Sequence, residues 1–194
     1  DMEIFLGKNS QVEINFLQKN SKNNLFIFDL KSNQKDDSDL KILLECKGKI
    51  FGKNNFVSIL NSNNSKVEVS TKVDIKSSCV LQNKIEVLHI GQNCNSNQNC
   101  KHILDGSSKF FFEGIIHIKK NAKNSNAYQK NDSILLCENS DLESKPVLKI
   151  FEDQVKCSHG ATIGKIDQDQ IFYMKSRGIK EIKANKIFLK SFLG

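Results

Sequence analysis

Apolar and polar residues alternate along much of the chain with a period of two. The alternation is clearest over residues 67–75, where every odd position is apolar or Thr. Successive side chains of a β-strand point to opposite faces, so this pattern indicates a half-buried strand. We find no convincing helical periodicity before Asp167. The chain up to that point is therefore predicted to be all-β.

Further short apolar segments lie between turns that are rich in Asn, Ser and Gly. They predict strands at residues 12–16, 25–30, 42–46, 56–60, 85–90, 110–118, 134–137 and 147–151. The polar stretches 31–39 and 95–99 are predicted to be flexible loops, because they lack alternating apolar residues.

Three all-β architectures fit this pattern: a sandwich, a barrel, or a parallel β-helix in which each rung stacks on its neighbour. Asn-rich turns and short strands favour the β-helix. The sequence has no clean repeat of fixed length that would establish it from the pattern alone.

The C-terminal part of the chain has helical signals instead. Asp167 can cap a helix, and Gln170 three residues later completes a capping-box pattern. Gly178 stands where a left-handed residue would end that helix. A second helix from about Lys180 would have a broad apolar face that packs on its own domain or docks a partner; this face comprises Ala184, Phe188 and Phe192, flanked by Ile182, Leu189 and Leu193. We predict a β-helix core domain over residues 1–165 and a helical segment over 166–194.

Composition narrows the classes of function. The net charge is +7, from 29 basic and 22 acidic residues. The lysines are scattered and accompany no nucleic-acid motif, which favours a solvated surface over nucleic-acid binding. The six cysteines come without a signal peptide, and no apolar run approaches a membrane span. We therefore expect free thiols, a cytoplasmic location and no membrane partner.

Several catalytic signatures are absent from the sequence: a P-loop, a dinucleotide-binding fingerprint, a nucleophile-elbow serine and a CxxC pair. An ATPase or a classical hydrolase is therefore disfavoured as the activity of this chain. A β-helix enzyme acting on carbohydrates stays a remote alternative. Such enzymes need clustered carboxylates, and the acidic residues here are dispersed.

One group of potential metal ligands is formed by His89, Cys94, Cys100 and His102. Two thiols and two imidazoles can close a tetrahedral zinc site, but five residues between the cysteines is not a standard zinc spacing. Whether these residues bind a metal stays open.

A second group is formed by Cys157 and His159, which are two residues apart and would point the same way along a strand. Thiolate and imidazole suit iron, zinc and copper(I). Two ligands do not complete a site, so a second chain would have to supply the others. The alternative is a packed cysteine and a hydrogen-bonded histidine at the end of a sheet.

The residues around this pair resemble a known family. The stretch VKCSHGATIG at 155–164, followed by 171–173 and 176–179, resembles a signature of the SufB/SufD family of iron–sulfur cluster assembly proteins. Upstream segments at 104–107, 127–132 and 145–150 follow the order of that family. The resemblance is dense from His89 to Ile179. We expect the chain to be a fragment that lacks the family's N-terminal helical segment.

The resemblance implies a right-handed parallel β-helix with a short C-terminal helical segment. It implies a non-enzymatic subunit that pairs with a SufB-like subunit and docks a SufC-like ATPase. The docking residues would lie in the helical segment: Ile171, Phe172, Tyr173, Arg177 and Phe188. The chain alone would hold no stable cofactor. Iron or an iron–sulfur cluster would pass transiently through the SufB interface.

His159 matches a histidine that the family places at that interface, which makes it a candidate metal ligand beside Cys157. SufB-type members have Glu-rich residues around this histidine and a cysteine near position 131. This chain has Ser158, Gly160 and Asn131 instead, which favours the SufD type over a SufB-like scaffold. A self-associating β-helix, forming a homodimer, stays open as a further alternative.

Overall fold

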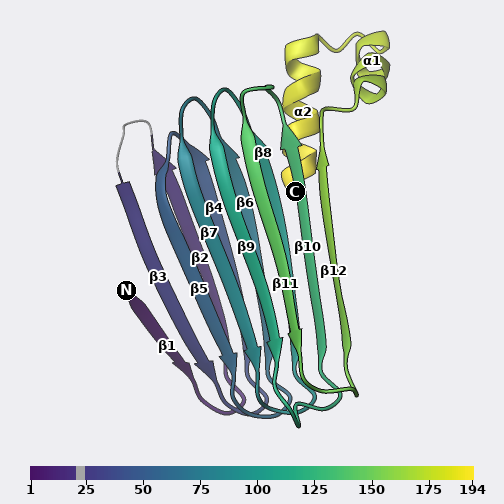
Figure 1. Cartoon of the computed structure of the whole chain (residues 1–194). Helices are drawn as coiled ribbons and strands as arrows, with labels where there is room; N and C mark the ends of the chain where they lie inside the picture. The colour runs from purple at the N-terminus through teal and green to yellow at the C-terminus, as the bar shows by residue number, and fades with distance from the viewer. Residues whose placement is uncertain (21–24) are drawn as a thin grey trace.

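The computed structural model describes residues 1–20 and 25–194, which form a parallel β-helix followed by two helices (Figure 1). Successive strands alternate between two six-stranded parallel sheets. Sheet A has the order β1-β3-β5-β7-β9-β11, and sheet B has the order β12-β10-β8-β6-β4-β2. The predicted β-helix is therefore confirmed, and the sandwich and the barrel are excluded.

The strands of sheet A are β1 (Met2–Leu6), β3 (Leu25–Gln34), β5 (Phe51–Leu60), β7 (Val80–His89), β9 (Lys109–Ile118) and β11 (Asp141–Ile150). Those of sheet B are β2 (Gln11–Asn20), β4 (Asp39–Gly48), β6 (Lys66–Ile75), β8 (Asn95–Leu104), β10 (Asn126–Leu135) and β12 (Lys156–Gly164). The helices are α1 (Gln168–Ser176) and α2 (Glu181–Leu193). No helix in the described ranges is long and apolar enough to cross a membrane.

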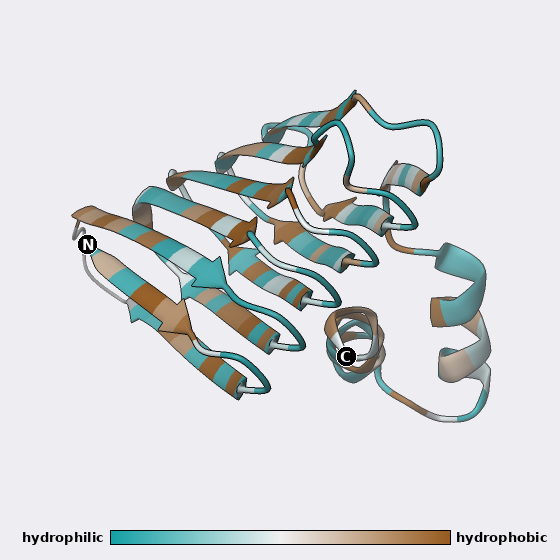
Figure 2. Ribbon diagram, turned by 90° about the horizontal axis from the view of Figure 1, so that it is seen from below, coloured by the Kyte–Doolittle hydropathy of each residue, from teal (hydrophilic) through white to brown (hydrophobic). Residues whose placement is uncertain are grey.

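The core lies between the two sheets and is filled by alternate residues of every strand. Figure 2 shows this alternation as bands of apolar and polar colour along the ribbons. The first rungs hold aromatic side chains, with ring centroids of Phe16 and Phe28 4.7 Å apart and those of Phe28 and Phe56 5.8 Å apart. Burying large aromatic side chains contributes more to stability per residue than burying small ones.

One turn recurs at the corner where a strand of sheet A leads into sheet B, in every rung but the last. A residue with positive φ is followed there by Ser or Cys; the positive-φ residues are Asn9, Asp37, Asn64, Asn93 and Asn124. Asn and Asp tolerate this conformation better than other non-Gly residues. Backbone bonds stack the turns, as where Asn64 N donates to Gln92 O at 2.9 Å. These dipeptides mark the rungs, and their unequal spacing explains why no fixed period is visible in the sequence.

The loop predicted at 31–39 is confirmed only for residues 35–38, and the loop predicted at 95–99 is wrong. Residues 31–34 continue β3 and Asp39 begins β4, while 95–99 form the first half of β8. Asn95–Asn99 pair with β6 on one side and with β10 on the other. Because both neighbours supply backbone partners, pairing outweighs the low strand propensity of Asn and Ser. The strand predicted at 134–137 ends at Leu135 and begins earlier, at Asn126.

A substitution at Gly91 tests how closely the backbones of successive rungs pack. A Cβ atom added to Gly91 would overlap the backbone carbonyl of Ser62 in the preceding rung. Backbone cannot move aside as a flexible side chain can, so Gly91→Ala is expected to lower the free energy of unfolding by about 1–3 kcal/mol. Urea unfolding followed by circular dichroism measures the change. Gly7→Ala is the matched control, because nothing lies within 4 Å of a Cβ atom there; equal effects of the two substitutions would contradict the expectation.

Candidate functional site

The last rung of the β-helix is formed by β11 and β12, and each strand pairs on one side only. Within the described residues, β11 pairs with β9, and β12 pairs with β10. The inward side chains of this rung therefore have no further rung to cover them (Figure 1). We call these inward positions of β11 and β12 the terminal face.

The backbone of β12 has a complete free edge. Lys156 N donates to Ser125 O of the adjacent rung at 3.0 Å. In a parallel ladder alternate residues bond to the same neighbour, so the even-numbered residues of β12 bond to β10. The N–H and C=O groups of Cys157, His159, Ala161 and Ile163 consequently face the free edge. These same residues have inward-directed side chains.

The free edge of β11 is less complete. Asp141 N donates to Ser108 O at 2.9 Å, so the odd-numbered residues of β11 bond to β9. Pro146 is even-numbered, and its missing N–H therefore falls on the free edge. Proline is tolerated on an edge strand in this orientation, and it removes one donor that another strand would need. Of the two edges, β12 is better suited to receive an added strand.

Cys157 is half-buried and packs against a small apolar cluster. Its neighbours are Ile116, Ile118, Ala122 and Ala127. Burial raises the pKa of the Cys157 thiol, and a backbone hydrogen bond with Ala127 opposes this change. A thiol whose pKa is raised is a weaker metal ligand, since the thiolate is the binding form.

His159 lies two residues further along β12, and its side chain is exposed. It is in register with Gln129 of β10, which is in register with Gln98 of β8. We call Gln98, Gln129 and His159 the polar column. The same inward position is occupied in the three earlier rungs of sheet B by Ile14, Ile42 and Val69. This interior column thus changes from apolar to polar toward the terminal face.

The two glutamines were not identified from the sequence. Gln98 lies in a segment that was predicted to be a loop, and Gln129 lies in the unpredicted part of β10. The Asn–Cys and Asn–Ser turns that precede β8 and β10 are the signal that could have aligned Gln98 with Gln129.

His89, Cys94, Cys100 and His102 each have a separate environment. His89 Nε2 lies 2.8 Å from Ser96 Oγ, and Cys94 Sγ donates to Ser62 O at 3.2 Å. Burial raises the pKa of Cys100 to about 12 and lowers the pKa of His102 to about 3. Across the described ranges, no three His, Cys, Asp or Glu side chains come together in a way that could hold a metal ion.

The helical segment begins as the sequence suggests. Asp167 accepts hydrogen bonds from the backbone N–H groups of Asp169 and Gln170 and so caps α1. The side chain of Gln170 donates to Asp167 Oδ2 at 3.0 Å. After α1, Gly178 has a φ of 83°, and Ile179 N donates to Met174 O at 3.1 Å. Both ends of α1 are therefore fixed by local hydrogen bonds.

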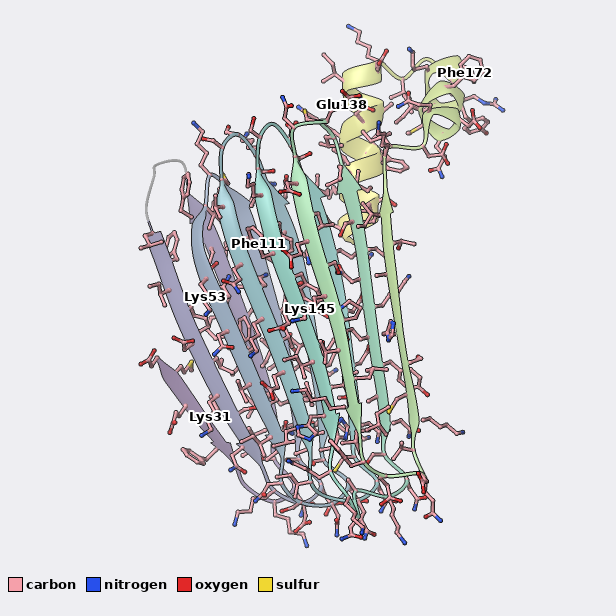
Figure 3. The ribbon with its side chains drawn as sticks, in the orientation of Figure 1. Lys31, Lys53, Phe111, Glu138, Lys145 and Phe172 are labelled. Atoms are coloured by element: carbon pink, nitrogen blue, oxygen red, sulfur yellow. The ribbon has the colours of Figure 1, made fainter. Side chains whose placement is uncertain are left out.

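The residues predicted to dock an ATPase divide into two groups. Ile171 is 3% exposed and Phe188 is half-buried, so both help to pack the helical segment. Phe172 and Tyr173 are 72% and 60% exposed, and the Arg177 guanidinium lies 5.4 Å from the Tyr173 ring centroid. Figure 3 shows Phe172 on α1, away from the sheets.

Two lysines of sheet B hold the C-terminal end of α2. Lys101 Nζ donates to Phe192 O at 2.6 Å and lies 5.7 Å from the centroid of the Phe192 ring. Lys72 Nζ donates to Gly194 O at 2.6 Å. Cations stabilise the negative end of a helix dipole, so these contacts favour the observed position of α2.

Fold and terminal face together define a parallel β-helix subunit with an open strand edge beside a thiol and an imidazole. Residues 2–192 match the family model described as "SUF system FeS cluster assembly, SufBD core domain". Because the match spans nearly the whole chain, the protein belongs to this family. The SufB/SufD resemblance seen in the sequence is thereby confirmed.

Curated relatives agree with this assignment. The chain is 33% identical over 133 residues to "Iron-sulfur cluster assembly protein SufD" of Escherichia coli, which covers 69% of this chain and 31% of that protein. It is 28% identical over 192 residues to a SufBD family protein of Synechocystis, covering 99% of this chain and 42% of the relative. The matched region is thus less than half the length of either relative.

The buried imidazole of His102 predicts a pH dependence of stability. Its pKa is lowered from 6.5 to about 3 in the folded chain, because burial disfavours the charged form. The unfolded state takes up a proton as pH falls below 6.5 while the folded state does not, so stability is lost from about pH 6.5 down to about pH 3. Between pH 7 and pH 5 we expect this residue to contribute a loss of about 2 kcal/mol.

Denaturant unfolding of wild type and His102→Gln at both pH values measures this contribution. The glutamine variant should lose less stability on acidification than the wild type. His159→Gln is the control, since it replaces an exposed imidazole, and it should keep the wild-type dependence. Identical pH dependence of wild type and His102→Gln would refute the assignment.

Proposed function

We propose that this chain is a non-enzymatic, SufD-like subunit of iron–sulfur cluster assembly. It pairs through its terminal face with a SufB-like β-helix subunit, and its helical segment docks a SufC-like ATPase. The observation that carries this proposal is the position of His159: its side chain points to the uncovered interior while its backbone N–H and C=O face the free edge of β12. A partner strand bound there would bring its own side chains beside this imidazole.

The free edge of β12 supports pairing by strand addition. An added strand would bond to the backbone of Cys157, His159, Ala161 and Ile163, which gives affinity that does not depend on side-chain identity. The outward residues of β12 are Lys156, Ser158, Gly160, Thr162 and Gly164, mostly small residues that allow close approach. A second β-helix would continue both sheets and cover the terminal face.

His159 is the functional member of the thiol–imidazole pair. It is exposed, whereas Cys157 is half-buried in an apolar cluster with a raised pKa. Neutral imidazole binds first-row transition metals. Iron or a nascent cluster is the cargo of this reaction, held between His159 and ligands of the partner rather than by this chain alone.

The helical segment is suited to transmit an ATPase motion. Phe172, Tyr173 and Arg177 give α1 an exposed aromatic and cationic surface of the composition that protein interfaces favour. α1 contacts α2, and α2 contacts β8. Movement of α1 would therefore reach sheet B through α2 and the lysine contacts at its end.

His159→Ala tests the site in a reconstituted complex of this chain with SufB-like and SufC-like subunits. We expect cluster assembly, followed by the visible absorption of the iron–sulfur product, to fall by about tenfold or more, because an imidazole ligand is removed. Ser158→Ala changes the outward neighbour and should leave assembly intact. Unchanged assembly in the His159→Ala complex would exclude the proposed role.

Ala161→Pro tests the docking edge. Ala161 does not bond to β10, so proline there should spare the fold while it removes one free-edge donor and crowds the added strand. We expect about tenfold weaker association with the SufB-like subunit in analytical ultracentrifugation. Pro146→Ala is the control; it adds a donor to β11 and should not weaken pairing.

Analytical ultracentrifugation also distinguishes association with a SufB-like subunit from self-association of this chain. If the chain alone forms a dimer that Ala161→Pro dissociates, a second copy also uses this edge. Association with the SufB-like subunit that is insensitive to Ala161→Pro would contradict docking at β12.

A further inference from the structure

Two buried glutamine side chains lie directly beneath His159 in the polar column. Gln98 is 0% exposed and Gln129 is 3% exposed. Gln98 Nε2 donates to Ile115 O at 3.2 Å, but Gln98 Oε1 and both polar atoms of the Gln129 amide have no hydrogen-bond partner among the described residues. A buried polar atom without a partner costs about 1–3 kcal/mol. Ile or Val, which occupy the same position in earlier rungs, would avoid this cost.

Gly114 of β9 makes room for the glutamine pair. In the same inward position of sheet A, the two preceding rungs have Phe56 and Ile85. A Cβ atom on Gly114 would overlap Gln129 Nε2 and would lie 3.0 Å from Gln98 Oε1. The two amides therefore share one space that a side chain at position 114 would fill. At these positions sheet A has a glycine and sheet B has amides, where the earlier rungs have larger apolar residues.

We propose that Gln129 acts with His159 to bind a divalent first-row transition-metal ion that enters at the terminal face, and that Gln98 positions the Gln129 amide. The site deepens the proposed function and rests on it. Gln129 and His159 are in register on neighbouring strands, which lie about 4.8 Å apart, so both side chains can reach one ion. Gln98 Oε1 can accept from Gln129 Nε2, which leaves Gln129 Oε1 free as a ligand.

The donor set fits transient binding of such an ion. An amide oxygen and an imidazole nitrogen are both ligands for ferrous and similar divalent ions. Neither ligand is charged, so the ion keeps its full charge and is held weakly enough to pass to anionic ligands of a partner.

Titration of the full chain with Co(II) alone, followed by visible absorption, tests the site without any assembly partner. Wild type should bind Co(II), and His159→Ala should abolish the signal. Gln129→Leu should weaken binding by about tenfold or more. Gln34→Leu is the matched control, since Gln34 is another buried amide, at the far end of β3, and it should leave Co(II) affinity unchanged.

The Gln129→Glu variant distinguishes two roles of Gln129: a metal ligand and an amide that only supports the fold. With a carboxylate in the site, Co(II) should bind about tenfold more tightly and should raise the melting temperature more than in wild type. A structural amide predicts a destabilised variant that Co(II) does not rescue, which would overturn the proposal. Wild-type affinity in a folded Gln129→Leu chain would overturn it as well.

These results are independent of the test of function. If His159→Ala stops cluster assembly while Gln129→Leu binds Co(II) as wild type does, the glutamine site fails and the assembly role stands. If His159→Ala leaves assembly intact, the assembly role fails whatever the Co(II) titration shows.

Discussion

Backbone hydrogen bonding between successive parallel strands is the interaction on which this structure depends. It fixes the register of every rung, and register places residues from distant parts of the sequence in one column. It also cannot be completed at the ends of the stack. The free N–H and C=O groups of β12 are thus a direct consequence of how the fold is held together. An assembly subunit of the SufBD family can use this unavoidable edge as its binding surface.

The interior differs between the two ends of the β-helix. In the first rungs, Phe16, Phe28 and Phe56 pack against one another, and two buried amides bond to each other, since Asn54 Nδ2 donates to Asn83 Oδ1 at 2.9 Å. In the last rungs, Gln98 and Gln129 replace aliphatic residues at equivalent positions. Buried amides weaken a core, so the apolar rungs must offset their cost. Gln98 and Gln129 lie toward the end of the stack that has the free edge of β12.

The helical segment and the terminal face are joined through sheet B. β12 leads directly into the capped start of α1, and α2 returns to lie on β8, held by Lys101 and Lys72. Figures 1 and 2 show α2 lying alongside sheet B. Because α1 contacts α2 and α2 contacts the strand that contains Gln98, the helical segment connects the two proposed interfaces.

Features that depend on local pattern can be predicted from the sequence. Alternation over 67–75 specified strands, Asp167 and Gly178 specified a capped helix, and the two-residue spacing put Cys157 and His159 on one face. Other features depend on contacts between segments that are far apart in the sequence. Residues 95–99 became a strand because two neighbours pair with them, and Gln129 came to lie beneath His159 because stacking sets a register that no local pattern encodes. Long-range backbone pairing is therefore the reason why these features could not be predicted from local sequence pattern.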